Sequence, residues 1–421
     1  MQIQLENIRS FCGTHIIPVR PLTLLIGENS TGKTTFLSML AHVSQPGFAS
    51  LRPSFNIAPF DLGTFDSIVT FKGGSFGRAE SFSVGFTQAK NGEQISVLAT
   101  YVDFMGQPQL SRLLVNGLSS EILFELSRDL SFGKVLIKGQ TGSRTEFPVS
   151  FKKTVLGDLP VIFLLRNLIF ERAHQQGKVD LMSETVIDTF SALSQMITPI
   201  FALAPVRTKP KRTYDEISDE FRPEGDHIPV LLARTWQEEG EARVFEALQE
   251  FGEISSLFRD IRVRRLGKKP SDPFQIMVTV AGPAANLPDV GYGVSQALPI
   301  IVQSVLAPRK RMLLLQQPEV HLHPRSQAAL GSFFARLVSR EKKQFVVETH
   351  SDYLIDRIRQ EVAKGNISPD EVLILFFEKE EIETQVHQIK LDPDGSLVGV
   401  PESYRRFFLE EELSLLSRAN K

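Results

Sequence analysis

The chain contains one cysteine, Cys12, and no long uninterrupted apolar run, and neither acidic nor basic side chains dominate it. A single cysteine excludes a disulfide framework and a cysteine-rich zinc site, and it favours a reducing compartment. The apolar stretches are far shorter than the roughly 18 residues that span a bilayer, and the charged N-terminus lacks the apolar core of a signal peptide. We therefore expect a cytoplasmic protein without membrane insertion.

Acidic and basic side chains nearly balance, since 47 lysines and arginines accompany 49 aspartates and glutamates, for a formal net charge of −2. Any contact with nucleic acid must therefore come from local patches. Hydrophobic residues make up 42% of the 421 residues, which is enough to bury a core and excludes disordered and fibrous classes. At about 150 residues each, the length predicts two or three lobes.

Strand and helix patterns alternate at both ends of the chain. Residues 2–26 contain three strand-like runs, the last of which, LTLLI, leads through a glycine-rich loop into the helical pattern FLSMLAHV. After residue 260, strand patterns such as MLLLQQ and QFVVET alternate with helical ones, including ALPIIVQSVL, which places Pro299 in a tolerated early turn. This alternation predicts an α/β fold with a largely parallel sheet covered on both faces.

The middle of the chain is less regular. Residues 54–101 are rich in Gly, Phe, Thr and Val and predict small antiparallel strands. Over 110–250, SSEILFELSRDL, DTFSALSQMI and RVFEALQEFGEI carry apolar residues at intervals of three and four, which predicts separate helices. Prolines and the absence of heptads exclude a long coiled-coil arm. We divide the chain into domains at 1–101, 102–255 and 256–421, the middle one a compact, mainly helical insertion.

Residues 27–35, GENSTGKTT, fit the phosphate-loop pattern G-x-x-x-x-G-K-[ST], with the strand before it and the helix after it that the motif requires. In such a loop the backbone N–H groups surround the nucleotide phosphates, Lys33 contacts the β and γ oxygens, and the Thr34 hydroxyl coordinates Mg²⁺. The alternative is a chance glycine-rich turn. The sequence predicts ATP and Mg²⁺ as cofactors, and the residues predicted to bind them here are Gly27, Asn29, Ser30, Thr31, Gly32, Lys33, Thr34 and Thr35.

Three further motifs follow in order: DVGYGVSQ at 289–296, LLLQQPEVHLHP at 313–324 and VVETHSD at 346–352. Together with the phosphate loop, they resemble the ABC-type ATPase heads, in particular the OLD-like AAA-type ATPases of bacterial anti-phage systems such as Septu or PARIS. The resemblance covers the first 35 residues and most of 285–365, while the middle matches weakly, through APVRTKPKRTY at 204–214. It implies an ABC-ATPase-like head with a P-loop parallel sheet, an antiparallel β subdomain and an inserted, mainly helical lid.

The resemblance implies that GYGVSQ is a signature motif, whose helix N-terminus points at the γ-phosphate held by a second subunit. ATP would then join two heads in a homodimer or a higher homo-oligomer. Taken alone, the residues also allow a glycine turn before a core helix. The residues predicted to contact the nucleotide from this motif are Gly291, Gly293, Ser295 and Gln296.

The third motif departs from the family pattern, because Gln316 replaces the acidic Mg²⁺ ligand and Gln317 replaces the catalytic glutamate. Glutamine can orient water or offer a carbonyl oxygen to a metal, but it cannot accept a proton, and a general base contributes about 10² to 10⁴ in rate. We therefore expect slow ATP hydrolysis. Glu319 and Glu348 are candidate substitutes, although Glu319 after Pro318 is equally compatible with a solvated side chain.

Three histidines lie within these motifs. His350 corresponds to the family's switch histidine, which hydrogen-bonds the γ-phosphate, and the alternative is a core histidine. We assign Gln317, Glu319 and His350 to catalysis, and Thr34 and Gln316 to the metal. His321 and His323 are poor candidates for zinc, since no cysteine lies nearby, and the resemblance places them in a D-loop at the dimer interface.

Basic clusters occur at 207–212, 262–269 and 308–311. Such clusters can hold nucleic-acid phosphates without reading sequence, although most are solvated faces. The residues through which nucleic acid could bind are Arg207, Lys209, Arg212, Arg262, Arg264 and Arg265.

No effector chemistry is evident in the chain. We expect no Toprim nuclease domain of the kind found in OLD-type nucleases in the short stretch after His350, and Asp392 and Asp394 in DPDG predict a turn between strands. The resemblance therefore implies an ATPase whose dimerisation regulates a separately encoded nuclease or toxin. Two alternatives stay open: an ATP-locked scaffold without turnover, and a DNA-repair or chromosome-handling ATPase.

Overall fold

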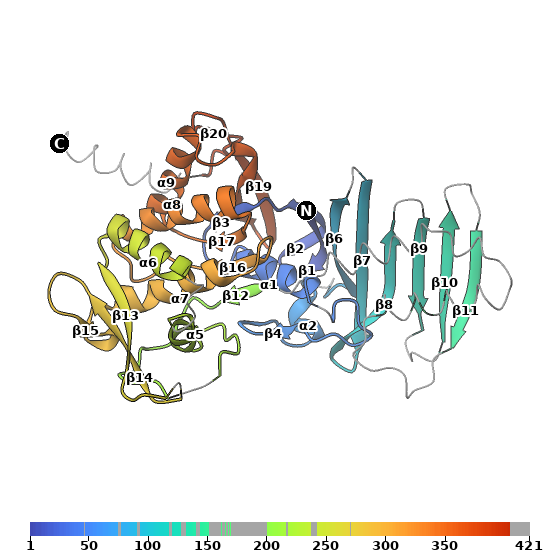
Figure 1. Ribbon diagram of the computed structural model, residues 1–421. Helices are drawn as coiled ribbons and strands as arrows, with labels where there is room; N and C mark the ends of the chain where they lie inside the picture. The colour runs from blue at the N-terminus through green and yellow to red at the C-terminus, as the bar shows by residue number, and fades with distance from the viewer. Residues whose placement is uncertain are drawn as a thin grey trace, which may run out of the picture.

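Two large sheets dominate the computed structural model (Figure 1), one of seven strands and one of eight, with smaller sheets of three and two strands. In the described part of the chain, no helix is long and apolar enough to cross a membrane. The structure describes residues 1–404 with the exception of 46, 75–76, 91–92, 118–119, 128–131, 140–143, 151–160, 162–164, 166, 168, 170–199, 216–217, 237–241 and 270.

The seven-stranded sheet has the order β12-β16-β17-β3-β18-β19-β20 and is parallel from β12 to β18. β19 and β20 join antiparallel at one edge, while the other strands are parallel. The prediction of a largely parallel sheet is therefore confirmed. The predicted DPDG turn also forms between these two strands, where the amide of Gly395 donates to the carbonyl of Asp392 at 2.9 Å. The strands are β3 Leu22–Gly27, β12 Phe201–Leu203, β16 Met312–Gln316, β17 Gln344–Glu348, β18 Val372–Glu380, β19 Glu383–Leu391 and β20 Leu397–Val398.

Both faces of this sheet are buried, because alternate residues of its apolar strands belong to different cores. In β3, Leu22, Leu24 and Ile26 pack with the side chains of α7, α8 and α9. Leu25 points the other way and packs with α1 and the eight-stranded sheet. The helices are α1 Lys33–Val43, α2 Phe65–Ile68, α5 Ile228–Thr235, α6 Ala242–Ser255, α7 Tyr292–Leu306, α8 Pro324–Glu341 and α9 Asp352–Ala363, with short helices η3 Leu287–Asp289 and η4 Pro369–Glu371.

The eight-stranded sheet is antiparallel throughout, in the order β11-β10-β9-β8-β7-β6-β1-β2. In Figure 1 it extends to the right, away from the parallel sheet, and so forms the predicted antiparallel β subdomain. Its strands are β1 Gln2–Ile8, β2 Phe11–Pro18, β6 Ser81–Lys90, β7 Glu93–Phe104, β8 Gln107–Asn116, β9 Ser120–Leu126, β10 Phe132–Gly139 and β11 Arg144–Ser150.

The prediction of a mainly helical insertion is wrong over 102–150, where most of the described residues belong to strands β7 to β11, and the boundary at 101/102 falls inside β7. In SSEILFELSRDL, Ile122 and Phe124 are fully buried whereas the intervening Leu123 is half-buried, which is the alternation of a strand. Pairing with β8 and β10 therefore decides the conformation of this segment. DTFSALSQMI lies outside the described residues, and RVFEALQEFGEI forms α6 as predicted.

The helix containing Pro299 also differs from the prediction. The glycine turn is itself the first turn of α7, with Gly291 as the N-cap, so Pro299 lies inside the helix rather than in an early turn. A proline at this position donates no hydrogen bond to the carbonyl one turn earlier. The remaining strands are β4 Asn56–Ile57, β5 Phe60–Asp61, β13 Asp260–Arg265, β14 Phe274–Thr279 and β15 Ala285–Asn286.

His42 of α1 links the stability of the fold to pH. Its ring is 2% exposed and stacks on Phe55 with centroids 4.0 Å apart, and burial lowers its pKa from 6.5 to about 3. Since the unfolded chain takes up this proton at a higher pH than the folded chain, the free energy of unfolding falls as pH falls from about 6.5 to about 3, by at most about 1.4 kcal/mol per pH unit. Urea unfolding at pH 7 and pH 4.5 should show a smaller pH dependence for His42→Leu than for the wild type. An identical pH dependence in both proteins would contradict this role.

Candidate nucleotide site

The phosphate loop joins β3 to α1 at the carboxyl edge of the parallel sheet. Gly27 ends β3 with φ 134°, and a Cβ there would lie 2.1 Å from the carbonyl oxygen of Phe377 on β18. Gly32 caps α1 with φ 100°. Both conformations favour glycine, and the backbone contact at Gly27 leaves no room for a side chain. The local geometry therefore requires the glycines of the motif as well as its order of strand, loop and helix.

Lys33 and Thr34 begin α1 and present the two chemical groups that the motif requires. The Lys33 ammonium donates to the carbonyl oxygens of Gly27 at 2.9 Å and Glu28 at 2.6 Å, so it lies across the loop. Burial lowers the pKa of Lys33, an effect that the carboxylate of Glu348 opposes. Thr34 is exposed, and its hydroxyl donates to Oε2 of Glu348 at 3.3 Å. A cation, a hydroxyl and a carboxylate thus meet at the start of α1.

The rest of the loop is held by β19. The Thr31 hydroxyl donates to the carbonyl of Glu28 at 2.8 Å, and the Thr31 carbonyl accepts from the hydroxyl of Thr384 at 2.9 Å. Asn29 and Ser30 are exposed, and Ser30 has φ 63°. Beyond them, Thr35 is buried within α1. Asn29 and Ser30, like Thr34, are therefore predicted binding residues whose side chains solvent reaches.

The ends of β16 and β17 carry polar residues at the same edge. Gln316 is the register partner of Glu348, and both are buried. The next residue, Gln317, has φ 44°, and its amide donates to the carbonyl of Glu348 at 2.7 Å. The substituted glutamine pair thus lies beside a carboxylate from the neighbouring strand.

Glu319 is 8% exposed, so the alternative of a solvated side chain after Pro318 is wrong. One of its carboxylate oxygens accepts from the backbone amide of His350 at 2.7 Å. Burial raises the pKa of Glu319, and the hydrogen bond from His350 opposes this shift. The His350 side chain is exposed at the end of β17, which excludes a core histidine. Glu319 therefore connects the third and fourth motifs through the backbone of His350, the predicted switch position.

Arg207 is buried at this edge of the sheet, although the sequence predicted a surface position where it could bind nucleic acid. It is 3% exposed, and its guanidinium approaches the carbonyl oxygens of Gln316 and Gln317 at 3.5 Å, so its expected role in binding nucleic acid at the surface is wrong. Burial lowers its pKa to about 10, an effect opposed by Glu319, so it remains protonated at neutral pH. The cause is β12, which pairs with β16 and directs the following residues past the end of that strand.

The predicted signature residues begin α7 and contact the predicted D-loop, around His321, of the same chain. A Cβ on Gly293 would lie 3.1 Å from the carbonyl oxygen of His321, and the Tyr292 ring meets the His321 ring edge-on at 5.1 Å. The Ser295 hydroxyl donates to the carbonyl of Tyr292 at 2.7 Å, and Gln296 is buried. The two motifs are therefore packed as one surface.

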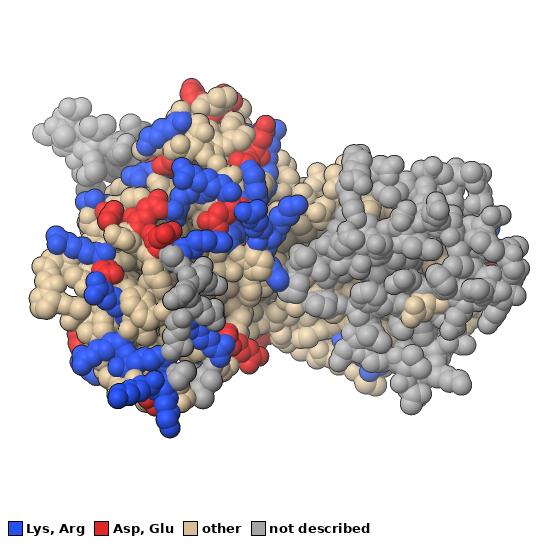
Figure 2. Space-filling view, in the orientation of Figure 1, with Lys and Arg blue, Asp and Glu red and all other residues tan. Residues whose placement is uncertain are grey.

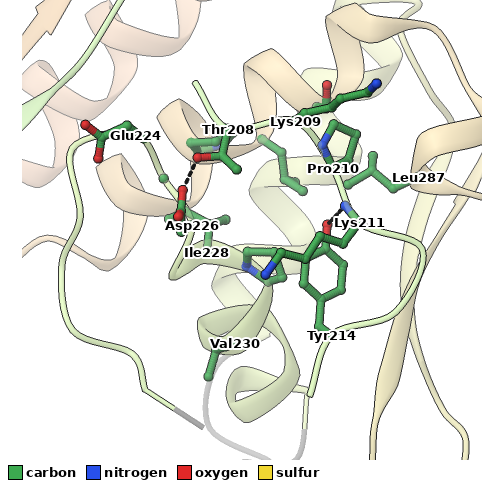
Figure 3. A pocket seen from close by; sticks show the side chains of 15 residues that line it. Thr208, Lys209, Pro210, Lys211, Tyr214, Glu224, Asp226, Ile228, Val230 and Leu287 are labelled. Atoms are coloured by element: carbon green, nitrogen blue, oxygen red, sulfur yellow. Dashed lines mark hydrogen bonds between the residues drawn. The ribbon is translucent and has the colours of Figure 1, made fainter. Parts of the chain in front are cut away.

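A small cavity separates α7 from the segment after Arg207 (Figure 3). Its lining includes Thr208 and Lys211 from this segment and Ser295 and Pro299 from α7. Its volume is about 40 Å³, near that of one water molecule and too small for a nucleotide. The segment from Arg207 to Lys211 therefore extends from the end of β16 to α7, the helix of the predicted signature motif.

The donor set at Thr34 fits Mg²⁺, which prefers hydroxyl, carboxylate and water oxygens. Thr34 and Glu348 are in contact, and the end of β16 brings Gln316 opposite Glu348. In the described ranges, no group of three or more His, Cys, Asp and Glu residues could hold a metal. His323 instead caps α8, where its Nδ1 accepts from the amide of Arg325 at 3.3 Å.

Several basic residues proposed for nucleic acid have acidic or backbone partners. Figure 2 shows Lys and Arg side chains gathered over β13 and β14, with acidic side chains between them. Arg212 pairs with Asp289, and Arg262 pairs with Asp260. Arg265 donates to backbone carbonyls of Asp272 and Ala233, while Lys209 and Arg264 are exposed.

Comparisons with known proteins agree with the resemblance drawn from the motifs. A model of an AAA ATPase domain matches residues 171–355, and a model of an AAA domain matches residues 2–112. The OLD nuclease of Thermus scotoductus (strain ATCC 700910 / SA-01) is 22% identical over 400 residues, which is 92% of this chain. The chain spans 66% of the length of that relative. The resemblance to OLD-like AAA-type ATPases is thereby confirmed, while its Septu or PARIS subtype stays a prediction.

Among solved structures, the chain is similar to the SMC head bound to the C-winged helix domain of ScpA, with 14% sequence identity and a TM-score of 0.44. That match covers 93% of this chain and 97% of the SMC head chain. The SMC head domain from Thermotoga maritima has 12% identity and a TM-score of 0.40, and the match covers 91% of this chain and 97% of that chain.

Arg207 and Glu319 should be energetically coupled, because each reduces the cost of burying the other's charge. Arg207→Met is expected to lower the free energy of unfolding by about 1 to 3 kcal/mol, since it removes the guanidinium contacts with the carbonyls of Gln316 and Gln317 and the positive charge near Glu319. The double variant Arg207→Met with Glu319→Gln should lose at least about 1 kcal/mol less than the sum of the single losses. Denaturant unfolding of all four proteins measures the coupling. Strictly additive losses would show that the two charges do not interact.

Proposed function

We propose that this chain, an AAA-type ATPase of the OLD-like kind, binds ATP with Mg²⁺ at the phosphate loop and hydrolyses it slowly between two copies of itself. The observation that supports this most directly is the Thr34 hydroxyl 3.3 Å from the Glu348 carboxylate, next to the buried Lys33 ammonium. ATP phosphates would replace the loop carbonyls as acceptors for Lys33, and Mg²⁺ would neutralise phosphate charge beside Thr34. Gly27 to Thr35 would surround the phosphates.

Glu319 is the proposed general base in this scheme. Its burial raises its pKa, which makes it a better proton acceptor than an ordinary carboxylate, and the His350 amide fixes its position. Gln317 can orient the attacking water but cannot take its proton. The exposed His350 side chain is placed to hydrogen-bond the γ-phosphate. We expect slow ATP hydrolysis, because Glu319 lies two residues after Gln317, the position that the catalytic glutamate occupies in the family pattern.

Dimerisation is proposed because the signature helix begins at an exposed surface. Tyr292, in the first turn of α7, is 43% exposed, and the neighbouring His321 is also exposed. The N-terminus of this 15-residue helix carries partial positive charge, which favours a phosphate of a second copy's ATP. Gly291, Gly293, Ser295 and Gln296 would complete the partner's nucleotide site, for which the buried side chains of Ser295 and Gln296 must become accessible at this helix N-terminus.

The proposed output is control of a separately encoded nuclease or toxin in anti-phage defence, by analogy with OLD-like ATPases. The nucleic-acid alternative has weaker support, since Arg207 is buried and Arg212 and Arg262 are paired with local carboxylates.

Steady-state phosphate release separates a slow ATPase from an ATP-locked scaffold. The wild type should release phosphate above background, and Lys33→Ala should not, because it removes the cation that binds the phosphates. Glu319→Gln should lower kcat by about 10² to 10⁴ if this carboxylate is the base. The matched control is Glu246→Gln, which changes an exposed glutamate on α6 and should leave kcat unchanged. Nucleotide binding without any phosphate release by the wild type would support the scaffold instead.

Mixing two inactive variants tests whether each site is shared between copies. Lys33→Ala lacks the phosphate-loop cation, and Ser295→Ala lacks the signature hydroxyl, so each homodimer should be inactive. A mixed dimer contains one site with both residues intact and should recover up to about half of the wild-type activity per dimer, as expected for one of two composite sites. Phosphate release is measured against mixing ratio. Activity that stays at the single-variant level at every ratio would contradict a shared site.

A further inference from the structure

We infer that Glu348 supplies the acidic metal ligand that Gln316 cannot provide. The inference rests on the proposed binding of ATP with Mg²⁺ and assigns the metal to a carboxylate on the strand next to the usual one. A glutamine carbonyl carries no formal charge, so Gln316 alone would give Mg²⁺ a weaker protein ligand than a carboxylate.

The sheet register explains how a carboxylate on β17 can serve the same site as a carboxylate at the end of β16. β16 and β17 are parallel neighbours, and Gln316 and Glu348 are direct partners at their last pair. A carboxylate moved from position 316 to position 348 is therefore displaced by one strand spacing, about 4.8 Å, at the same height along the sheet. The displacement is toward the phosphate loop, because β17 also pairs with β3, the strand that leads into it.

The contacts of Glu348 direct its charge at the metal position. It is 6% exposed, and its Oε2 accepts the hydrogen bond of Thr34, whose hydroxyl is the predicted Mg²⁺ ligand of the phosphate loop. The Lys33 ammonium is close enough for Glu348 to oppose the fall in the lysine pKa. A buried carboxylate requires compensating positive charge, and when Lys33 turns to the ATP phosphates a divalent cation can provide it.

Glu319 is not equivalent to Glu348, although both are buried glutamates at this edge. The carboxylate of Glu319 accepts from the amide of His350, and its charge interacts with Arg207 rather than with Lys33. The two acids thus face different cations. This division assigns Glu348 to the metal and leaves Glu319 for the attacking water.

The test measures metal affinity directly, with Mn²⁺ as the probe and a non-hydrolysable ATP analogue as the nucleotide. Electron paramagnetic resonance reports bound Mn²⁺, and calorimetry reports nucleotide affinity with metal and with chelator. Glu348→Gln should weaken Mn²⁺ binding to the nucleotide complex by about 10- to 100-fold, the range typical of residues that support a metal site. Nucleotide affinity in chelator should not fall, since Glu348 repels phosphate. Glu319→Gln and Glu246→Gln should retain wild-type Mn²⁺ affinity.

A purely structural role for Glu348 predicts a different result. Glutamine can accept the Thr34 hydrogen bond as well as glutamate, so Glu348→Gln would then bind Mn²⁺ like the wild type, and that outcome overturns the inference. Glu348→Asp keeps the charge on a shorter side chain and should lie between wild type and Glu348→Gln. If Glu348→Gln does not fold, Glu348→Asp decides alone, because unchanged Mn²⁺ affinity would again overturn the assignment. Failure of the wild type to bind the nucleotide at all would instead contradict the proposed function.

Discussion

The parallel register of β3, β17 and β16 is the constraint on which the site depends. It brings the carboxyl ends of three strands to one edge, where β3 continues into the phosphate loop and the other two end in Glu348 and Gln316. Side chains separated by about three hundred residues in the sequence meet there, as the contact between Thr34 and Glu348 shows. The close approach of the Phe377 carbonyl to Gly27 fixes the loop against β18 on the opposite side. Ligands of open α/β sheets bind at such an edge.

Gln316 and Gln317, at and just after the end of β16, replace the acidic pair of the family pattern. Two other carboxylates, those of Glu348 and Glu319, are nevertheless present at this edge. Glu348 occupies the end of the neighbouring strand beside the proposed metal position, and Glu319 accepts a hydrogen bond from the backbone amide of His350, the predicted switch histidine. Arg207 provides positive charge close to Glu319. Two buried carboxylates with separate cations can perform separate tasks, whereas two close carboxylates without them would each favour protonation of the other. The sequence change is therefore compatible with a working site.

Local patterns predicted much of this fold. The strand, loop and helix of the phosphate motif, the strands and helices after residue 260 and the DPDG turn form as expected, except that α7 begins earlier than predicted. They could be predicted because each is specified by residues close together in the chain. SSEILFELSRDL fits both helical and strand spacing, and only its pairing with β8 and β10 selects the strand. The short strand β12 has too few residues to show a period, so the burial of Arg207 beside β16 could not be foreseen. The burial of Glu319 likewise depends on tertiary contacts.

The most direct measurement of the central claim is a structure of the wild-type protein with Mg²⁺ and a non-hydrolysable ATP analogue. We expect Mg²⁺ about 2.1 Å from the Thr34 hydroxyl, with a Glu348 oxygen bound to it directly or through one water. We also expect Ser295 of a second copy at the γ-phosphate. Nucleotide bound in a single copy, with Glu348 turned away from the metal, would contradict both the shared site and the role of Glu348.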